Sequence, residues 1–389
     1  MTNSNWNYPT TIWFGAGRIN ELAKACMQLG IKKPLFVTDE GLVKLDIVKN
    51  TCAILKKDKV EFSVFSEVQG NPTGKNVEDG VKHFNANSHD GVIAFGGGSA
   101  IDAAKAIAFM AGQQRSLWQF EDIGDNWTYA IEEAIVPIIA VPTTSGTGSE
   151  VGRASVILDE ESQSKKIIFH PKMLPEIVIS DPELTLGLPA HITAWTGVDA
   201  MVHAIEAYCA PGYHPMAEGI AIEAIRLISK YLPKAVENGA DLEARAQMLV
   251  AASMGATAFQ KGLGSVHSVA HQLGALYNKQ HGLLNAIILP YALKQNEEAI
   301  ADKMNYLSLV LELEGKGTDA VISYILELRK QLKIPHTLAE IGIGDEKAAL
   351  IGSMAFQDPS TPSNAKSVDA QDLEKLFRAA VSGDLNYID

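Results

Sequence analysis

The first half of the chain alternates short apolar runs with segments of helical period. Apolar or alternating runs predict β-strands at residues 34–38, 60–65, 91–95, 136–141, 154–158 and 177–179. Residues 41–57 and 74–87 carry helical patterns between the first of these runs. Strands and helices in this order form a mainly parallel sheet with helices on both faces. We therefore predict an α/β fold for this half.

The pattern changes after Asp181-Pro182-Glu183-Leu184. From residue 189 onward the apolar positions recur with helical period and β-branched runs are few. Breaks between helices are expected at Pro211, Gly239, Gly262, Pro290 and Pro335. A chain of 389 residues is too long for one ordinary core. We predict two domains, an α/β domain at residues 1–183 and an all-helical domain at residues 184–389.

Three glycines, residues 96–98, follow the buried run at 91–95 and lead into a helix. Backbone amides in such a loop, together with the positive end of the helix, form an anion site that suits a pyrophosphate. We expect Ser99 to cap this helix and Asp102 to complete a reciprocal cap. The loop departs from the G-x-G-x-x-G fingerprint and follows a later strand than the first. A glycine-rich helix entry can also serve only as a tight turn.

Two further loops favour a dinucleotide over a lone phosphate. Residues 142–150 follow a buried run and offer four hydroxyl residues beside two glycines, which can donate to phosphate and ribose oxygens. The alternative is a plain Ser/Thr turn. Asp39 ends an early strand, where its carboxylate can accept both ribose hydroxyls of an adenosine. The alternative for Asp39 is a helix N-cap.

Five ionisable residues in the second half lie at helical spacing within apolar sequence. Asp199 and His203 are four residues apart, as are His267 and His271, and His281 follows. Four residues is one helical turn, so each pair lies on one helix face. One carboxylate oxygen and up to four imidazole nitrogens can therefore converge on Zn²⁺ or Fe²⁺. A single His on an apolar helix is more often a satisfied core residue, but this many would be costly without a partner.

Composition narrows the class of protein. With 47% apolar and 20% charged residues the chain is globular, and its net charge of -13 disfavours nucleic acid or an anionic membrane as partner. Three scattered cysteines exclude a thiolate metal site and a disulfide framework, which fits a cytoplasmic compartment. The polar start has no signal peptide, and no apolar run reaches the length of a membrane span. We expect a small-molecule substrate and a homodimer or larger homo-oligomer.

Taken in order, these motifs resemble those of the iron-containing (group III) alcohol dehydrogenase family, over nearly the whole chain. The motifs that carry the resemblance are Gly96-Gly97-Gly98-Ser99 with Asp102, the loop at residues 142–150, Asp181-Pro182-Glu183-Leu184, and the series Asp199, His203, His267 and His281. The resemblance implies a dehydroquinate-synthase-like N-terminal domain that binds a dinucleotide, a helical C-terminal domain, and an active site in the cleft between them.

The resemblance also implies residue roles. It assigns the metal to Asp199, His203, His267 and His281, and leaves His271 as a non-ligand near the nicotinamide that relays a proton. It implies cofactor contacts at Asp39, Asn71, Gly97, Gly98, Ser99, Asp102, Thr143, Thr144, Thr147, Val156, Lys165 and Leu184.

Within the family, the chain looks most similar to 4-hydroxybutyrate dehydrogenases. This similarity rests on Ala210-Pro211 with Pro215, on Gly219-Ile220-Ala221, and on residues 259–264, which include Lys261. Gln272 is a departure, because many members have proline after the second imidazole of this segment. Lys261 is the stronger candidate to hold a substrate carboxylate, and Arg153, which a solvated surface position would equally explain, is the other.

We therefore predict a metal-dependent oxidoreductase that interconverts a small primary alcohol, such as the ω-hydroxy acid 4-hydroxybutyrate, and its aldehyde. Asp39 favours NAD over NADP, because a 2′-phosphate would meet its carboxylate; the metal is Fe²⁺ or, alternatively, Zn²⁺. A plain short-chain alcohol dehydrogenase is the nearest alternative. A metal hydrolase, a dehydroquinate-synthase-like lyase and a non-catalytic metal-stabilised protein are the others, and reduction of nicotinamide by alcohols separates the dehydrogenase from all three.

Overall fold

The computed structural model describes residue 8 and residues 10–388, the last two by their backbone alone. The chain divides into two compact units, an N-terminal unit (Tyr8–Gly187) and a helical unit that begins at Leu188. The domain boundary predicted at residues 183 and 184 falls within the short 3₁₀ helix η8 (Pro182–Thr185). How the two units divide the function stays a prediction.

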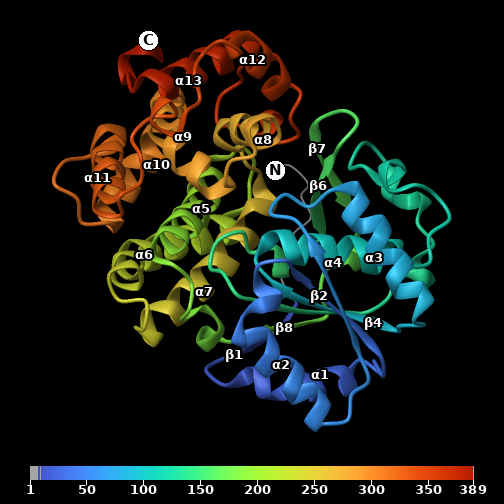
Figure 1. The fold of residues 1–389 in the computed structure, drawn as a ribbon. Coiled ribbons are helices and arrows are strands. Elements are labelled where there is room, and N and C mark those ends of the chain that lie inside the picture. The colour runs from blue at the N-terminus through green and yellow to red at the C-terminus, as the bar shows by residue number, and fades with distance from the viewer. Residues whose placement is uncertain (1–7, 9, 389) are drawn as a thin grey trace. The chain divides into compact units, whose positions relative to one another are not determined.

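The N-terminal unit contains a six-stranded, fully parallel sheet in the order β1-β8-β5-β4-β2-β3 (Figure 1). Its strands are β1 (Thr11–Phe14), β2 (Pro34–Asp39), β3 (Ser63–Val68), β4 (Gly91–Gly96), β5 (Ile138–Pro142) and β8 (Ile177–Ser180). The central strands β4 and β5 are buried along their whole length, as their uninterrupted apolar runs predict. The prediction of an α/β unit with a mainly parallel sheet is confirmed.

Helices cover both faces of this sheet. On one face lie α1 (Leu22–Gln28) and α2 (Asp46–Lys57), where alternate strand residues such as Phe36, Ile93 and Phe95 join the core. On the other face lie α3 (Gly74–Ala86) and α4 (Gly98–Met110) (Figure 1). Because all strands run in the same direction, the loops that follow β2, β4 and β5 leave the same edge of the sheet.

The run at residues 154–158 forms a strand outside this sheet. It is β6 (Ala154–Asp159), which pairs antiparallel with β7 (Ser164–Phe169) in a separate hairpin. The expectation that it extends the parallel sheet is wrong, because its side chains alternate between buried and partly exposed positions instead of being buried on both faces. The sequence patterns did not indicate β1 and β7.

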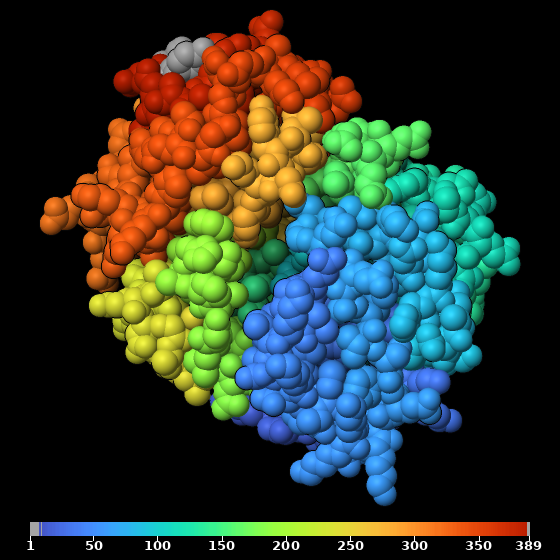
Figure 2. Space-filling view, in the orientation of Figure 1, coloured from blue at the N-terminus to red at the C-terminus, as the bar shows by residue number. Residues whose placement is uncertain are grey.

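The helical unit contains only helices among the residues that the structure describes. They are α5 (Ala190–Cys209), α6 (Pro215–Glu237), α7 (Leu242–Ala258), α8 (Ser265–Tyr277), α9 (His281–Gln295), α10 (Glu297–Val310), α11 (Gly317–Gln331), α12 (Ala348–Phe356) and α13 (Ala370–Ser382), with short 3₁₀ turns between some of them. Helices α5 and α9 are buried on nearly all sides, which makes them the centre of this unit. The connected helices α10 to α13 form the orange and red surface of the unit in the space-filling view (Figure 2).

One predicted break is wrong, because Pro290 lies inside α9. A proline in a helix lacks the N–H that would bond to the carbonyl four residues earlier, here the carbonyl of Ala286. The buried guanidinium of Arg329 replaces that donor, with Nη1 lying 3.0 Å from the Ala286 carbonyl oxygen and 2.8 Å from that of Ile287. The lost hydrogen bond is therefore compensated by a residue of α11. Within the described part of the chain, we find no helix that is both long and apolar enough to span a membrane.

Candidate metal centre and cofactor loops

Four of the predicted metal-binding residues converge in the helical unit. Asp199 and His203 lie one turn apart on α5, His267 lies on α8, and His281 is the first residue of α9. One potential ligand atom from each lies within 4.8 Å of the others. Three imidazoles and one carboxylate are a donor set that suits Fe²⁺ or Zn²⁺. The side chains therefore fit a divalent ion, and their role as its ligands stays a prediction.

Two glycines allow the helices to approach closely at this centre. A Cβ atom on Gly282 would lie 2.4 Å from the Trp195 carbonyl oxygen and 3.0 Å from the Cβ atom of Asp199. A Cβ atom on Gly255, in α7, would lie 2.9 Å from the Ala200 carbonyl oxygen. Any larger residue would separate α7 or α9 from α5, so these glycines help to bring the predicted ligands together.

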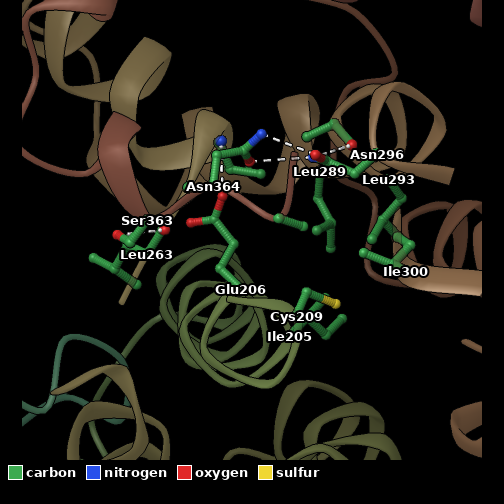
Figure 3. A pocket seen from close by; sticks show the side chains of 14 residues that line it. Ile205, Glu206, Cys209, Leu263, Leu289, Leu293, Asn296, Ile300, Ser363 and Asn364 are labelled. Carbon is green, nitrogen blue, oxygen red and sulfur yellow. Dashed lines mark hydrogen bonds between the residues drawn. The ribbon is translucent and has the colours of Figure 1, made fainter. Parts of the chain in front are cut away.

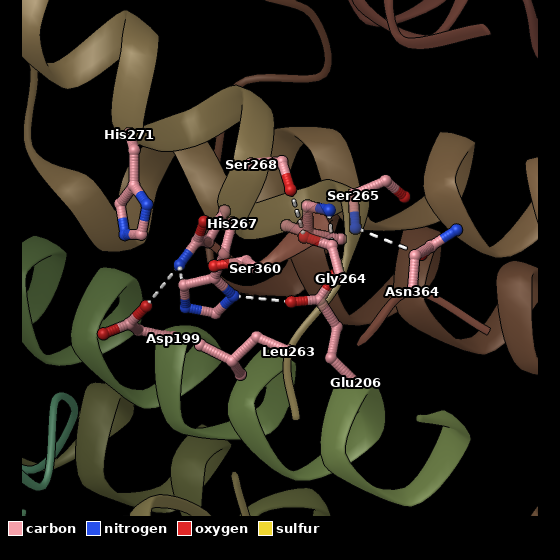
Figure 4. A network of polar contacts seen from close by, with 12 residues as sticks. Asp199, Glu206, Leu263, Gly264, Ser265, His267, Ser268, His271, Ser360 and Asn364 are labelled. Atoms are coloured by element: carbon pink, nitrogen blue, oxygen red, sulfur yellow. Dashed lines mark hydrogen bonds and ion pairs between the residues drawn. The ribbon is translucent and has the colours of Figure 1, made fainter. Parts of the chain in front are cut away.

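Two polar side chains surround the centre that the sequence patterns did not single out. Glu206 Oε2 lies 2.5 Å from His267 Nδ1 (Figure 4). Burial alone would lower the pKa of His267, but the hydrogen bond and the charge of Glu206 outweigh burial and raise it. Asn285 Nδ2 lies 2.6 Å from Asp199 Oδ1, 3.0 Å from His281 Nε2 and 3.2 Å from His267 Nε2.

Asn285 shows how polar the middle of the centre is. Its side-chain oxygen is buried and has no hydrogen-bond partner among the described residues, while its side-chain nitrogen has three acceptors nearby. An amide nitrogen has only two hydrogens to donate. The excess of acceptor atoms around this point is what a cation-binding centre requires.

His271 lies one turn after His267 on α8 but outside the group of four. Its Nδ1 atom lies 2.9 Å from Oδ2 of Asp358, which also accepts a hydrogen bond from the side-chain nitrogen of Gln272 at 3.1 Å. Burial would raise the pKa of Asp358, but the interactions with His271 and Ser360 outweigh burial and lower it. The ring of His271 stacks on that of His281 at a centroid distance of 5.4 Å. This position beside the ligands agrees with its predicted role as a non-ligand.

In the N-terminal unit, the glycine loop packs against the hydroxyl loop. Cβ atoms on Gly97 and Gly98 would lie 3.3 Å from the Thr144 side chain and 2.5 Å from that of Thr147, respectively. Thr143 N donates to the carbonyl oxygen of residue 96 at 2.9 Å. Five predicted cofactor residues are thus brought together where the parallel strands β4 and β5 end.

The predicted reciprocal cap of Ser99 and Asp102 is wrong. Helix α4 begins at Gly98, one residue before Ser99, and Gly97 occupies the N-cap position. The Ser99 hydroxyl instead donates to the Gly70 carbonyl oxygen at 2.6 Å. The Asp102 carboxylate accepts from the Ser149 hydroxyl at 2.5 Å and from Val156 N at 3.0 Å. Asp102 therefore ties α4 to the hydroxyl loop and the hairpin.

Lys105, on the same face of α4, supports this loop from inside. Its ammonium group is fully buried and donates to the carbonyl oxygens of Ser149, at 3.0 Å, and of Ala154. Burial lowers the pKa of Lys105, whereas the nearby Asp102 carboxylate opposes that shift. The hydroxyl loop is thus held in shape by a buried charge that the sequence patterns did not indicate.

The other predicted cofactor residues lie around these loops or on the hairpin. Asp39 Oδ1 accepts hydrogen bonds from the backbone nitrogens of Gly41 and Leu42, both at 2.9 Å. One of its oxygens therefore caps a turn, and the predicted contact with a ribose stays untested. The remaining positions are Asn71 in the loop before α3, Val156 on β6, Lys165 on β7 and Leu184 in η8.

Comparison with known proteins identifies the family. The model of the iron-containing alcohol dehydrogenases matches residues 9–182, and the model of the C-terminal region of the Fe-containing alcohol dehydrogenase family matches residues 193–381. The chain belongs to the iron-containing alcohol dehydrogenase family. It is therefore an oxidoreductase of alcohols and aldehydes, as the sequence motifs predict.

Relatives within the iron-containing alcohol dehydrogenase family carry different names. The chain is 34% identical over 385 residues to an NAD-dependent methanol dehydrogenase of Bacillus methanolicus, with 97% of this chain and 100% of the relative covered. It is 35% identical over 384 residues to a 4-hydroxybutyrate dehydrogenase of Cupriavidus necator, with 96% and 99% covered. Its fold is similar to a crystal structure of 1,3-propanediol oxidoreductase, with a TM-score of 0.92 at 35% identity and 97% and 100% covered.

The two cations considered for substrate binding in this alcohol dehydrogenase have different surroundings. Lys261 Nζ lies 2.7 Å from Glu218 Oε1, its side chain is 2% exposed, and Lys303 Nζ lies 3.2 Å from the same oxygen. Burial lowers the pKa of Lys261 to about 8. The Arg153 guanidinium lies over the Phe169 ring at 5.4 Å from its centroid. Lys261 thus has a protein carboxylate as partner, and its predicted contact with substrate stays untested.

Proposed function

We propose that this enzyme interconverts a small primary alcohol and its aldehyde with NAD(H), at a divalent metal centre formed by Asp199, His203, His267 and His281. The observation that carries the proposal is the convergence of one ligand atom from each of these residues within 4.8 Å. Fe²⁺ is the metal that the family name favours, and Zn²⁺ suits the same donor set.

A divalent ion in this set supplies Lewis-acid polarisation of the substrate oxygen, and a nicotinamide supplies hydride transfer. The protein side chains orient the reactants and handle the proton. Asp358 accepts from Nδ1 of His271, which leaves Nε2 of that ring to take up or return a proton through solvent. The buried setting of Asp199, His203 and His267 keeps bulk water away from the donor atoms.

We assign the dinucleotide to residues 1–183 and the metal to residues 184–389. Support for the first assignment comes from the glycine and hydroxyl loops, whose backbone amides and hydroxyls meet at the carboxyl ends of parallel strands. Asp39 ends the neighbouring strand β2, and a carboxylate there favours a ribose hydroxyl over a 2′-phosphate. We therefore propose NAD as the preferred cofactor over NADP.

For the substrate we propose an ω-hydroxy acid such as 4-hydroxybutyrate, with Lys261 as the cation for its carboxylate. Support comes from the relative of that name and from the charge around Lys261. Two ammonium groups, those of Lys261 and Lys303, share one oxygen of Glu218, so this cluster keeps one positive charge in excess. A second carboxylate would neutralise that charge.

Absorbance of reduced nicotinamide, followed with a panel of alcohols and aldehydes, tests the proposal when metal content is measured on the same sample. We expect NAD reduction by primary alcohols and NADH oxidation by aldehydes. A hydrolase or a lyase would give no net change in nicotinamide, and that result would reject the proposed function.

A further inference from the structure

Glu206 continues the metal-binding face of α5. Asp199, His203 and Glu206 stand at positions i, i+4 and i+7, so their side chains lie along one side of the helix. The Glu206 side chain is 7% exposed. Both of its oxygens contact the start of α8: Oε2 lies 2.5 Å from His267 Nδ1, and Oε1 lies 2.8 Å from Val266 N (Figure 4).

The contact with His267 determines which ring nitrogen carries the proton in the neutral imidazole. An ionised carboxylate only accepts hydrogen bonds, so the hydrogen lies on Nδ1 and the lone pair on Nε2. His267 Nε2 is the nitrogen directed into the centre, since it lies 3.2 Å from Asn285 Nδ2, which in turn lies 2.6 Å from Asp199 Oδ1. A metal needs that lone pair.

The other oxygen of Glu206 fixes the carboxylate in place. Val266 N belongs to the first turn of α8, whose N–H groups have no partner within the helix. A Cβ atom on Gly264 would lie 3.0 Å from Glu206 Oε1 and 2.7 Å from Asn364 Oδ1, so glycine is needed for both acceptors to reach this turn. Glu206 and Asn364 also line a cavity of about 20 Å³ (Figure 3). With both oxygens anchored, the carboxylate cannot rotate away from His267.

We infer that Glu206 is a positioning residue of the metal centre, which holds the lone pair of His267 Nε2 toward the ion. This inference rests on the proposed metal-dependent function. Partners of metal ligands that act in this way contribute roughly 10- to 100-fold to metal affinity or activity. The alternative role is a cap for α8 alone, in which case the contact with His267 would have no effect on the metal.

Glu206→Gln separates these roles, because it keeps the shape of the side chain but leaves one acceptor oxygen for two N–H groups. If that oxygen accepts from Val266 N, the amide NH₂ faces His267 Nδ1 and drives the proton to Nε2. We expect the variant to bind Zn²⁺ and Co²⁺ about 10- to 100-fold more weakly in chelator competition. The visible spectrum of its Co²⁺ form should also differ from that of the wild type.

Asn364→Ala is the matched control. It removes the other side chain that accepts from the first turn of α8, through Ser265 N at 3.1 Å, and leaves the contact between Glu206 and His267. We expect metal affinity close to that of the wild type, whatever its melting temperature. Equal losses of affinity in both variants would show that Glu206 is only a cap, and unchanged affinity in Glu206→Gln would also overturn the inference.

A second measurement does not depend on whether a variant folds. Nitrogen NMR of the metal-free wild type, at a pH where the imidazole is neutral, should show His267 protonated on Nδ1; protonation on Nε2 would overturn the inference. Turnover and metal content of the wild type are measured alongside. If the wild type binds metal and oxidises alcohols while Glu206→Gln binds metal equally well, the inference alone fails. If the wild type holds no divalent ion, the proposed function fails.

Discussion

The imidazole of His271 and the carboxylate of Asp358 lie 2.9 Å apart, Nδ1 to Oδ2, although 87 positions separate them in the sequence. We expect Asp358→Asn to lower kcat by roughly 10²-fold, the lower end of the range for general acid–base catalysis, because an amide no longer holds the ring in one tautomer. The KM for NAD should change little. Steady-state kinetics with the melting temperature measured in parallel would show this.

Gln272→Ala is the control for that prediction, because it removes the other donor to Oδ2 of Asp358 and leaves His271 in place. It should keep most of the wild-type kcat. Wild-type turnover in Asp358→Asn would mean that His271 needs no oriented partner.

The sequence patterns predict the parallel sheet and the metal cluster because both depend on short-range spacing. Uninterrupted apolar runs such as residues 91–95 are typical of strands buried on two faces. A four-residue spacing places Asp199 and His203 on one helix face without any knowledge of tertiary structure. Glu206 could have been found in the same way, since it lies at the next position of that face.

Other features depend on contacts between distant segments. Asp358 lies in a loop after α12, and nothing in its neighbourhood indicates that it faces His271. Pro290 reads as a break, and only the position of Arg329 shows why α9 continues through it. Ser99 reads as a cap, but the glycine before Gly98 already allows the helix to begin earlier. In each case tertiary contacts override a local preference.

Cofactor preference follows from Asp39. We expect the wild type to use NAD with a kcat/KM at least about tenfold above that for NADP, because placing like charges side by side costs several kcal/mol. Asp39→Asn keeps an oxygen for the turn at Gly41 and Leu42 but removes the charge. Its kcat/KM for NADP should therefore rise while its melting temperature stays the same. A wild type that prefers NADP would show that Asp39 only caps this turn.

Substrate preference tests the role of Lys261. We expect 4-hydroxybutyrate to exceed 1-butanol in kcat/KM by about ten- to a hundredfold, which corresponds to roughly 1.5–3 kcal/mol for a charge-assisted contact. Lys261→Met should lose this preference. Lys303→Met is the control, because it removes the other ammonium group on Glu218 Oε1 and should keep the preference. No preference in the wild type, or full preference in Lys261→Met, would favour a plain short-chain alcohol.

The pH dependence of stability gives a separate test of the same lysine. Burial lowers the pKa of Lys261 from 10.5 to about 8, so between these values the unfolded chain binds a proton that the folded chain lacks. Raising the pH through this window therefore stabilises the folded state. The free energy of unfolding of the wild type, relative to Lys261→Met, should rise across this window in denaturant titrations. A difference that stays flat would mean that Lys261 remains protonated when buried.

The most direct test of the metal centre is turnover in a preparation freed of metal by chelation, with metal content and nicotinamide absorbance measured on one sample. We expect turnover to vanish while the circular dichroism stays unchanged, because Asp199, His203 and His267 lie in a large helical unit with its own core. Adding back Fe²⁺ or Zn²⁺ should restore turnover in the wild type but not in His267→Ala. Full activity in a sample shown to contain no metal would contradict the account.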